Sequence, residues 1–337
     1  MQYRPLGNSG ISVSPLTVGC WSFGGDERSY WGGQSQHEVD RLVREALDLG
    51  VNLFDTAFGY NEGASEISLG RALAGHRERA MICNKIPIVP REKIPAYEDK
   101  IAGSLKRLGT DYIDILMIHW PTRDERLLRE NFEAILCVQQ RGLVRHIGVS
   151  NFGVRTLQIA REMGVRPVAD ELAYNLISRG IEKEILPRCI EEGIGVVAYM
   201  PIMQGILTGK FESLDAIPPA RRRTIHFDSR NNPAARHGGP GVEAELAEFL
   251  TRLSELARQS GMTPGDLSIA WVSSKPGISS VIAGCRSVDQ LHQNARAAET
   301  ALPADLVTLL DEASAKILEL LGRNADLWES PAKSRVW

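Results

Sequence analysis

The sequence predicts an α/β protein in which eight parallel strands close into a (β/α)8 barrel. Strand-like and helix-like segments alternate along the 337 residues, and the eight strand-like segments are apolar and rich in β-branched residues. Such segments indicate strands buried on both faces, and their alternation with helices requires parallel pairing with right-handed crossovers. Eight strands favour a closed barrel over an open sheet. No GxGxxG motif follows the first strand, which counts against a Rossmann domain.

The local pattern predicts where each element lies. Strands are expected at residues 16–21, 52–57, 80–86, 113–119, 146–151, 168–174, 195–201 and 279–285. Helices are expected where apolar residues recur at helical spacing, in most cases up to a terminal glycine. These segments are residues 37–50, 65–75, 94–109, 127–142, 154–164, 181–193 and 306–322.

Three segments fall outside this alternation. The first residues predict a short N-terminal hairpin that turns at Asn8–Gly10 and plugs the bottom of the barrel. Residues 203–241 are rich in Pro, Gly and Arg and have little periodicity, so they predict a long loop after the seventh strand, placed to act as a lid. Residues from about 323 to 337 predict a C-terminal tail. We expect one barrel domain over residues 1–337.

Composition and charge exclude several classes of function. The net charge of −3 and the pI near 6.2 argue against binding to nucleic acid or to an anionic membrane. The five cysteines are dispersed and never spaced as CxxC, which predicts reduced thiols in a cytoplasmic protein rather than disulfides or a metal site. No apolar run has the length of a signal peptide or a membrane span.

Four polar side chains come at or just past the C-terminal ends of predicted strands. Asp55 and Tyr60 follow the second strand, Lys85 ends the third and His119 ends the fourth. In a parallel barrel these ends share one rim, where such barrels carry their chemistry. A phenol, a carboxylate, an ammonium and an imidazole there can polarise and protonate a carbonyl oxygen. The alternative is that Tyr60 is a surface loop residue and that Asp55 and Lys85 form a structural ion pair.

Several stretches of the sequence resemble one enzyme family and occur in order at compatible intervals. They are VSPLTVGCWSFG, NLFDTAFGYNEGASEISLGRAL, LKRLGTDYIDILMIHWP, GLVRHIGVSNF, AYNLISR, GVVAYMPIMQGILTGK and IAGCRSVDQLHQNARA. With them the chain resembles the aldo-keto reductases over nearly its whole length, close to the branch that includes channel β-subunits. The resemblance implies a barrel that binds a nicotinamide cofactor.

The resemblance also implies a role for each of the four rim residues. Tyr60 is the general acid, and a free phenol has a pKa of about 10, too high for easy proton exchange at neutral pH. The ammonium of Lys85 lowers that pKa. Asp55 holds Lys85 in place, and His119 hydrogen-bonds the substrate oxygen.

The nicotinamide site is implied by the ends of three later strands. Ser150 and Asn151 match the residues that bind the carboxamide, although both could also cap the following helix. Glu171 stands where the family usually has Gln, and an ionised carboxylate offers no hydrogen-bond donor. It could instead accept from the carboxamide NH2 or bind a substrate hydroxyl. Tyr199 matches the residue that stacks on the nicotinamide, and Met200 stands where Ser is common.

The phosphate groups are implied to lie near two further motifs. Lys210 in QGILTGK matches the segment that wraps the pyrophosphate, and the Arg221–Arg223 run could extend it as part of a lid or be a solvated charge cluster. Arg286 at the start of a helix can bind a phosphate, which favours NADP(H) while NAD(H) stays possible. The cofactor residues implied in full are Gly19, Cys20, Trp21, Asp55, Ser150, Asn151, Glu171, Tyr199, Met200, Pro201, Gly205, Lys210, Gly284, Arg286, Gln290, Gln293 and Asn294.

Aromatic residues on the rim loops predict an apolar wall for a small-molecule substrate. The expected substrate pocket consists of Trp21, Trp31, Phe58, Tyr60, His119 and Trp120. The expected function is an NADP(H)-dependent oxidoreductase that interconverts a carbonyl, in an aldehyde, ketone or sugar, and an alcohol. Two alternatives stay open: a cofactor-sensing regulatory subunit, and a sugar or polyol dehydrogenase that acts mainly in the oxidative direction.

Overall fold

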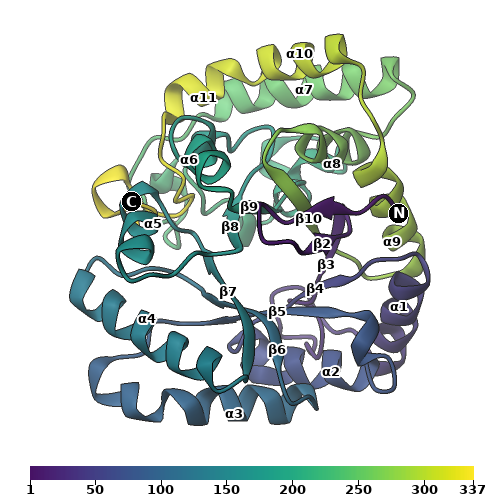
Figure 1. The fold of residues 1–337 in the computed structure, drawn as a ribbon. Helices are drawn as coiled ribbons and strands as arrows, with labels where there is room; N and C mark the ends of the chain where they lie inside the picture. Colours follow the sequence, from purple (N-terminus) through teal and green to yellow (C-terminus); the bar gives the residue numbers. More distant parts are fainter.

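The computed structural model describes residues 1–337 and contains a closed barrel of eight parallel strands (Figure 1). The strand order around the barrel is β10-β3-β4-β5-β6-β7-β8-β9. The barrel strands are β3 Leu16–Gly19, β4 Leu53–Asp55, β5 Met81–Ile86, β6 Ile113–Ile118, β7 Val144–Ser150, β8 Ala169–Ala173, β9 Gly195–Tyr199 and β10 Ile278–Gly284. Every predicted strand is present, so the predicted (β/α)8 barrel is confirmed.

Helices surround the barrel on all sides (Figure 1). They are α1 Gln36–Asp48, α2 Ala64–Ala72, α3 Tyr97–Leu108, α4 Glu125–Gln140, α5 Val154–Glu162, α6 Ile185–Glu192, α7 Glu243–Gln259, α8 Pro264–Ser274, α9 Val288–Glu299, α10 Ala304–Ala313 and α11 Ala315–Leu321. Helix α1 shows why they pack on the strands, because its buried residues all fall on one face. None of the helices combines the length and the apolar character needed to cross a membrane.

The N-terminal hairpin closes the bottom of the barrel, as predicted. Strands β1 Arg4–Pro5 and β2 Ser12–Val13 pair antiparallel, and Figure 1 shows the hairpin crossing the near end of the barrel. Leu6 and Val13 are fully buried and pack with inward-facing residues such as Ile115. A ligand can therefore enter the barrel only from the opposite end.

The strand register brings polar side chains of distant segments into one layer near that opposite end. In the register of the strands, Asp55 of β4 lies opposite Cys83 of β5, and Cys83 precedes Lys85 by two residues. Ser150 of β7 lies opposite Glu171 of β8. Because side chains alternate along a strand, Cys83 and Lys85 point to the same side of the sheet. The layer thus combines carboxylates from β4 and β8 with an ammonium from β5.

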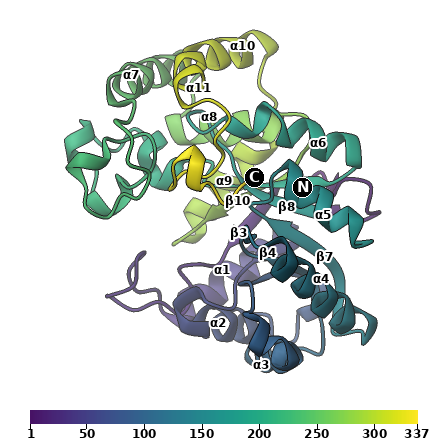
Figure 2. The ribbon, with the colours of Figure 1, turned by 90° about the vertical axis from the view of Figure 1, so that its left-hand side faces the viewer.

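Residues 203–241 connect β9 to α7 as a long loop with only short 3-10 turns, as predicted. Figure 2 shows this green segment projecting from one side of the barrel. The composition and weak periodicity of this loop do not indicate apolar anchors, but the structure contains them. Ile225 and Phe227 are buried, and the Ile225 N–H donates to the Leu327 carbonyl at 2.8 Å. The segment is therefore fixed near its middle.

The predicted helix over residues 306–322 is two helices, α10 and α11, which meet at Ser314. The Arg179 guanidinium donates to the Asp311 carbonyl and to Ser314 Oγ, both at 2.9 Å. In a continuous helix the Asp311 carbonyl would instead accept from the N–H four residues later. A buried arginine from another part of the chain thus ends the first helix.

Residues 323–337 are not a free tail, because they return to the rim of the barrel. Asp326 is fully buried and accepts from the Arg335 guanidinium at 2.8 and 2.9 Å. The Thr156 N–H at the start of α5 donates to the Trp337 carbonyl at 3.2 Å. The sequence could not predict this return, because it depends on partners in distant segments.

Candidate active site

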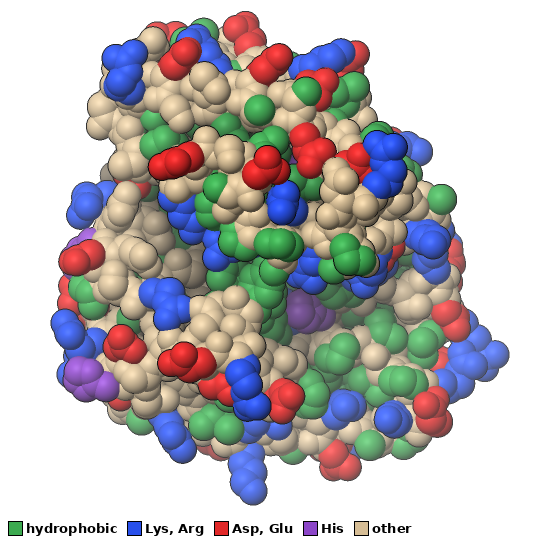
Figure 3. Space-filling view, turned by 180° about the vertical axis from the view of Figure 1, so that it is seen from behind, with side chains coloured by type: hydrophobic (Ala, Val, Ile, Leu, Met, Phe, Trp, Pro, Cys, Tyr) green, Lys and Arg blue, Asp and Glu red, His purple; other side chains and the backbone are tan.

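A cavity of about 1030 Å³ opens at the C-terminal rim of the barrel. One end contains Asp55, Tyr60 and His119, and the wall continues to Arg286 at the start of α9. Figure 3 views the face opposite that of Figure 1 and shows a groove with hydrophobic and basic side chains along it. Ligand pockets commonly measure roughly 300–1,000 Å³, so this one has room for a dinucleotide-sized ligand.

Lys85 is fully buried between two carboxylates at one end of this cavity. Its ammonium donates to Asp55 Oδ1 and, at 3.2 Å, to Glu171 Oε2. Burial lowers the pKa of Lys85, but the two carboxylates together more than offset burial, so the net direction is upward. Lys85 is therefore a fixed positive charge at neutral pH.

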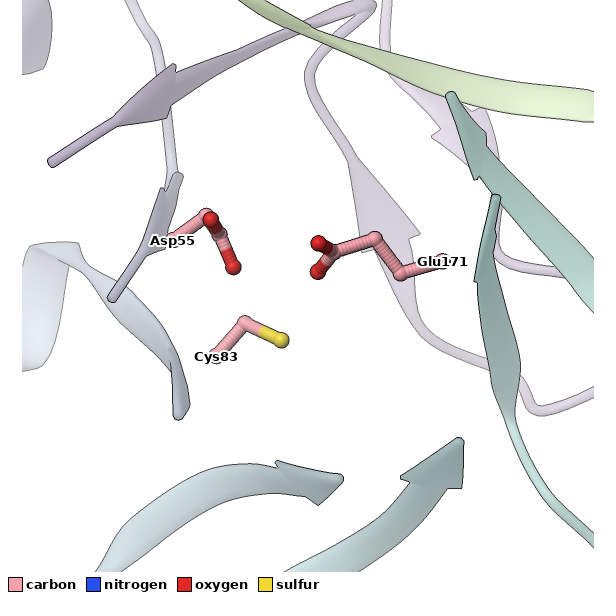
Figure 4. Close-up of side chains that lie close together, drawn as sticks. All are labelled: Asp55, Cys83 and Glu171. Carbon is pink, nitrogen blue, oxygen red and sulfur yellow. The ribbon is translucent and has the colours of Figure 1, made fainter. Parts of the chain in front are cut away.

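Figure 4 shows Asp55, Cys83 and Glu171 converging from β4, β5 and β8. Their carboxylate oxygens and thiol sulfur lie within 4.8 Å of one another. The Lys85 ammonium supplies the positive charge between the carboxylates. Burial, reinforced by Asp55, raises the pKa of Glu171 to about 8. The cluster holds two carboxyl groups for one ammonium, so it retains a proton near neutral pH.

Tyr60 lies beside this cluster, with the centre of its ring 5.1 Å from Lys85 Nζ. The chain turns sharply after it, since Asn61 and Glu62 have φ values of 47° and 56°. The Asn61 amide donates to the Trp21 carbonyl at 2.9 Å and so stabilises this turn. The unfavourable backbone conformation is held in place by its surroundings, a frequent feature of functional sites.

Burial raises the pKa of the Tyr60 phenol above its usual range. The Lys85 ammonium lowers this pKa, as the sequence predicts, but Asp55 and Glu171 raise it further. The predicted net lowering is therefore wrong for the protein without a ligand. Tyr60 keeps its proton at neutral pH and is a hydrogen-bond donor.

His119 packs edge-on against Tyr60, with the ring centres 5.8 Å apart. Burial, with smaller contributions from Lys85 and Arg335, lowers the pKa of His119 to about 3. The imidazole is neutral at neutral pH and has one N–H to donate. The phenol and the imidazole lie close enough to contact one small polar group together.

Aromatic side chains form one wall of the cavity. Trp21 stacks on Tyr60 at 5.5 Å and on Tyr30 at 5.4 Å, and Trp31 meets Trp21 edge-on at 5.6 Å. The Tyr30 hydroxyl donates to Gln204 Oε1 at 2.9 Å, which joins this wall to residues 203–241. The wall offers planar apolar surface beside the polar groups.

Hydrogen bonds hold the ends of β7 and β9 in an unfavourable conformation. Asn151 and Met200 directly follow these strands and have φ values of 62° and 59°. The Tyr199 hydroxyl donates to Asn151 Oδ1 at 2.7 Å, and the Asn151 amide donates to the His119 carbonyl at 3.0 Å. The Asn175 amide donates to the Met200 carbonyl at 3.0 Å. These bonds fix the Tyr199 ring at the cavity.

Cations without a carboxylate partner line another part of the cavity. Lys210 and Arg221 both lie in its wall, and burial together with Arg221 lowers the pKa of Lys210. Gly205 has φ 88°, and a Cβ atom there would lie 2.8 Å from Lys210 Nζ. Glycine at this position therefore lets the ammonium approach the main chain. The pair is suited to an anionic group.

The far end of the cavity is the N-terminus of α9. Ser287 caps this helix by accepting from the Gln290 N–H at 3.2 Å. The Arg286 guanidinium donates to the carbonyls of Trp31 and Gly33. Arg286 thus joins α9 to the loop before α1, and a helix N-terminus with an arginine is a favourable place for phosphate.

Comparison with known proteins shows which family the chain belongs to. The model of the aldo/keto reductase family matches residues 15–315. The chain belongs to the aldo/keto reductase family. It is also similar to the crystal structure of a thermostable aldo-keto reductase, Tm1743, in complex with the inhibitor epalrestat. The TM-score is 0.73 at 28% sequence identity, with 93% of this chain and 100% of that chain covered.

Two curated relatives of this aldo/keto reductase carry names of different kinds. A putative voltage-gated potassium channel subunit beta from Schizosaccharomyces pombe is 30% identical over 329 residues, which cover 92% of each protein. The NADH-specific methylglyoxal reductase of Escherichia coli is 28% identical, over 93% of this chain and 98% of that protein. The resemblance expected from the sequence is confirmed.

Most of the predicted cofactor residues of the aldo/keto reductase lie in the cavity wall. Those lining it are Gly19, Trp21, Asp55, Asn151, Glu171, Tyr199, Met200, Pro201, Gly205, Lys210, Gly284, Arg286, Gln290, Gln293 and Asn294. Cys20 and Ser150 do not, because both are fully buried beneath the wall. Ser150 Oγ donates to the Glu171 carbonyl at 3.1 Å and accepts from the Asn151 amide at 3.0 Å.

The predicted substrate-pocket residues lie in the cavity wall with one exception. Trp21, Trp31, Tyr60, His119 and Trp120 line it. Phe58 does not. Its ring packs against Lys100 and Arg107 of α3, with the cations about 4.9 Å from the ring centre. Placing Phe58 in the pocket was wrong, because the turn before Tyr60 directs this ring toward α3.

Sequence reasoning missed two groups of cavity residues. Trp328 and Arg335 come from the C-terminal segment, and Arg335 lies 3.6 Å from the centre of the Trp120 ring. Thr263 and Asp266 come from the start of α8. That start carries a recognisable signal, since Thr263 caps the helix and a proline follows at its first position. No local pattern gives such a signal for Trp328 and Arg335, because their positions depend on contacts such as that between Arg335 and Asp326.

Proposed function

We propose that this aldo/keto reductase is an NADP(H)-dependent oxidoreductase that interconverts a carbonyl and an alcohol, with Tyr60 as the general acid. The observation that carries the proposal is the convergence of a protonated phenol, a neutral imidazole and a buried ammonium at one end of a cavity of about 1030 Å³. The family establishes oxidoreductase chemistry on carbonyls as its general activity.

Each side chain at this end of the cavity has a separate role in carbonyl reduction. The neutral N–H of His119 and the hydroxyl of Tyr60 donate to the substrate oxygen and polarise the carbonyl. Tyr60 then gives its proton to that oxygen as negative charge develops on it. Lys85 stabilises the phenolate left behind, because its ammonium lies 5.1 Å from the centre of the Tyr60 ring and lowers the pKa of the phenol. In alcohol oxidation the same groups act in reverse.

The residues present fit a nicotinamide dinucleotide. The aromatic ring of Tyr199 faces the cavity near Tyr60, the unpaired cations Lys210 and Arg221 suit a pyrophosphate, and the N-terminus of α9 suits a further phosphate. The bound cofactor supplies a hydride for reduction or accepts one in oxidation. Stacking on Tyr199 would leave one face of the nicotinamide toward the substrate.

A substrate screen tests the proposed activity. The purified chain is assayed against aldehydes, ketones, sugars and the matching alcohols, with NADPH, NADH and their oxidised forms. We expect a change in nicotinamide absorbance that depends on the organic substrate and is faster with the NADP(H) pair. Binding of a cofactor without turnover of any substrate class would favour a regulatory role, which the names of the potassium-channel relatives suggest.

Replacing Arg286 with alanine should separate the two cofactors. We expect weaker binding of NADPH and nearly unchanged binding of NADH, because only NADPH carries a 2′-phosphate for the guanidinium. Fluorescence titration with both cofactors measures the difference. Arg286 also holds the Trp31 and Gly33 carbonyls. Equal weakening of both cofactors would therefore mean that the arginine acts only by holding that loop.

Cofactor should protect residues 203–241 from proteolysis. Arg221–Arg223 are half-buried, and Arg221 donates only to the Gln204 carbonyl. We expect trypsin to cut at this run in the free protein and more slowly with NADP+, because a ligand stabilises the conformation that it binds. Cleavage after Arg323, whose side chain is 74% exposed and outside the cavity, is the control. Equal rates at the run under both conditions would identify the segment as a passive surface loop.

A further inference from the structure

We propose that Glu171 makes this enzyme bind the oxidised nicotinamide cofactor in preference to the reduced one, and that binding of the oxidised form releases a proton. The inference rests on the proposed cofactor and goes beyond it. It assigns to a single side chain a selectivity between the two redox forms of the same molecule.

The first observation is the net charge of the cluster around Glu171. Asp55 and Glu171 contribute two carboxylates, and Lys85 is the one ammonium that pairs with them. His119 is neutral, since its pKa is about 3, and Tyr60 keeps its proton. With both carboxylates ionised this end of the cavity carries one uncompensated negative charge.

The second observation is that this charge faces the cavity. Asp55 and Glu171 both belong to its wall, beside Tyr199 and Tyr60. Both carboxylates are nearly buried, with the Glu171 residue 4% exposed, so water screens them weakly. A charge in such a place interacts strongly with any charge that the ligand brings.

The proposed cofactor changes its charge with its redox state. Because Tyr60 would protonate the oxygen of the carbonyl whose carbon takes the hydride, the nicotinamide ring of a bound cofactor would lie at this end of the cavity. The oxidised ring carries a positive charge and the reduced ring carries none. The uncompensated charge therefore stabilises the oxidised form and contributes nothing to the reduced form. Glutamine at this position, usual in the family, would leave the cluster neutral.

Glu171 should lose a proton when the oxidised cofactor binds. In the protein without ligand, burial and Asp55 raise the pKa of Glu171 to about 8, so the carboxyl is largely protonated at neutral pH. A positive ring beside it lowers that pKa, and Glu171 then loses its proton. The preference for the oxidised cofactor should be greatest above pH 8 and should fade as pH falls. The other titratable groups that face Glu171 or lie next to it are Asp55, Tyr60, Cys83, Lys85, Asp170 and Tyr199.

Isothermal titration calorimetry of the full chain with NADP+ and NADPH tests the proposal without turnover. Each titration is run in two buffers of different ionisation enthalpy, at pH values on either side of about 8. At neutral pH we expect proton release with NADP+ and none with NADPH. The dissociation constant of NADPH divided by that of NADP+ measures the preference for the oxidised form. In Glu171→Gln this ratio should fall roughly tenfold or more and lose its pH dependence.

Asp266→Asn is the matched control. Asp266 lines the same cavity but belongs to α8 and accepts from Gln293, so its replacement likewise removes one carboxyl group from the cavity, at another place. It should alter both affinities alike and leave their ratio unchanged. An unchanged ratio in Glu171→Gln, or no proton release by the native chain, would overturn the proposal while cofactor binding stands. Absence of binding by either nicotinamide would instead refute the proposed function.

Discussion

Replacing Tyr60 with phenylalanine is expected to lower turnover roughly a hundredfold or more, the range of a lost general acid. The ring, and with it the stack on Trp21, is kept, so cofactor affinity should stay nearly unchanged. Steady-state kinetics and a cofactor titration on the same preparation measure both quantities. The effect should appear in kcat, because the hydroxyl acts on the oxygen that gains charge in the transition state.

Tyr97→Phe provides the control for this experiment. The Tyr97 side chain is buried on α3, its hydroxyl has no hydrogen-bond partner, and it does not line the cavity. Loss of that hydroxyl should leave turnover within about twofold of the native value, since the hydroxyl contacts no reacting group. Near-native turnover in Tyr60→Phe would remove Tyr60 from the mechanism.

Replacing Lys85 with methionine is expected to lower turnover by a similar factor, through the electrostatics of Tyr60 rather than through loss of the acid itself. Lys85 lowers the pKa of Tyr60 and pairs with both buried carboxylates. Its loss should slow turnover and raise the pKa seen in the alkaline limb of the pH–rate profile. It also leaves two buried carboxyl groups unpaired, which should cost on the order of 3 kcal/mol of folding free energy.

Lys210→Met separates this effect from a general loss of positive charge. Lys210 lies in the same cavity but does not act on Tyr60, so its replacement should weaken cofactor binding without moving the pH–rate profile. Circular dichroism and thermal unfolding establish that the Lys85 variant is folded under assay conditions. A Lys85→Met enzyme with a native rate and an unshifted profile would make the lysine purely structural.

The barrel and its four central side chains were predictable from the sequence for one physical reason. Apolar strands that alternate with helices must pair in parallel, and parallel strands end on the same rim. Residues at strand ends, such as Lys85 and His119, are therefore brought together whatever the details of the helices. The family resemblance indicated the expected cofactor residues, nearly all of which lie in the cavity wall.

The remaining features depend on contacts between distant segments, which local patterns do not encode. Arg335 reaches the cavity because buried Asp326 holds its guanidinium. Arg179 ends α10 from a different part of the chain. Burial raises the pKa of Tyr60, and Asp55 together with Glu171, which lies three strands away around the barrel from β5, opposes the lowering by Lys85. The sequence indicated the ammonium beside the phenol and placed Glu171 at the nicotinamide site, but it did not indicate that Glu171 pairs with Lys85.

Transfer of deuterium from a labelled cofactor tests the central claim most directly. Reduced nicotinamide cofactor is deuterated at the transferable position on one face or on the other, and the alcohol product is examined by mass spectrometry. Because Tyr199 is expected to stack on one face of the ring, the product should gain deuterium on its carbinol carbon from one label only. Alcohol formed with deuterium from both labels, or from neither, would contradict hydride transfer in a site built from Tyr60, His119 and Tyr199.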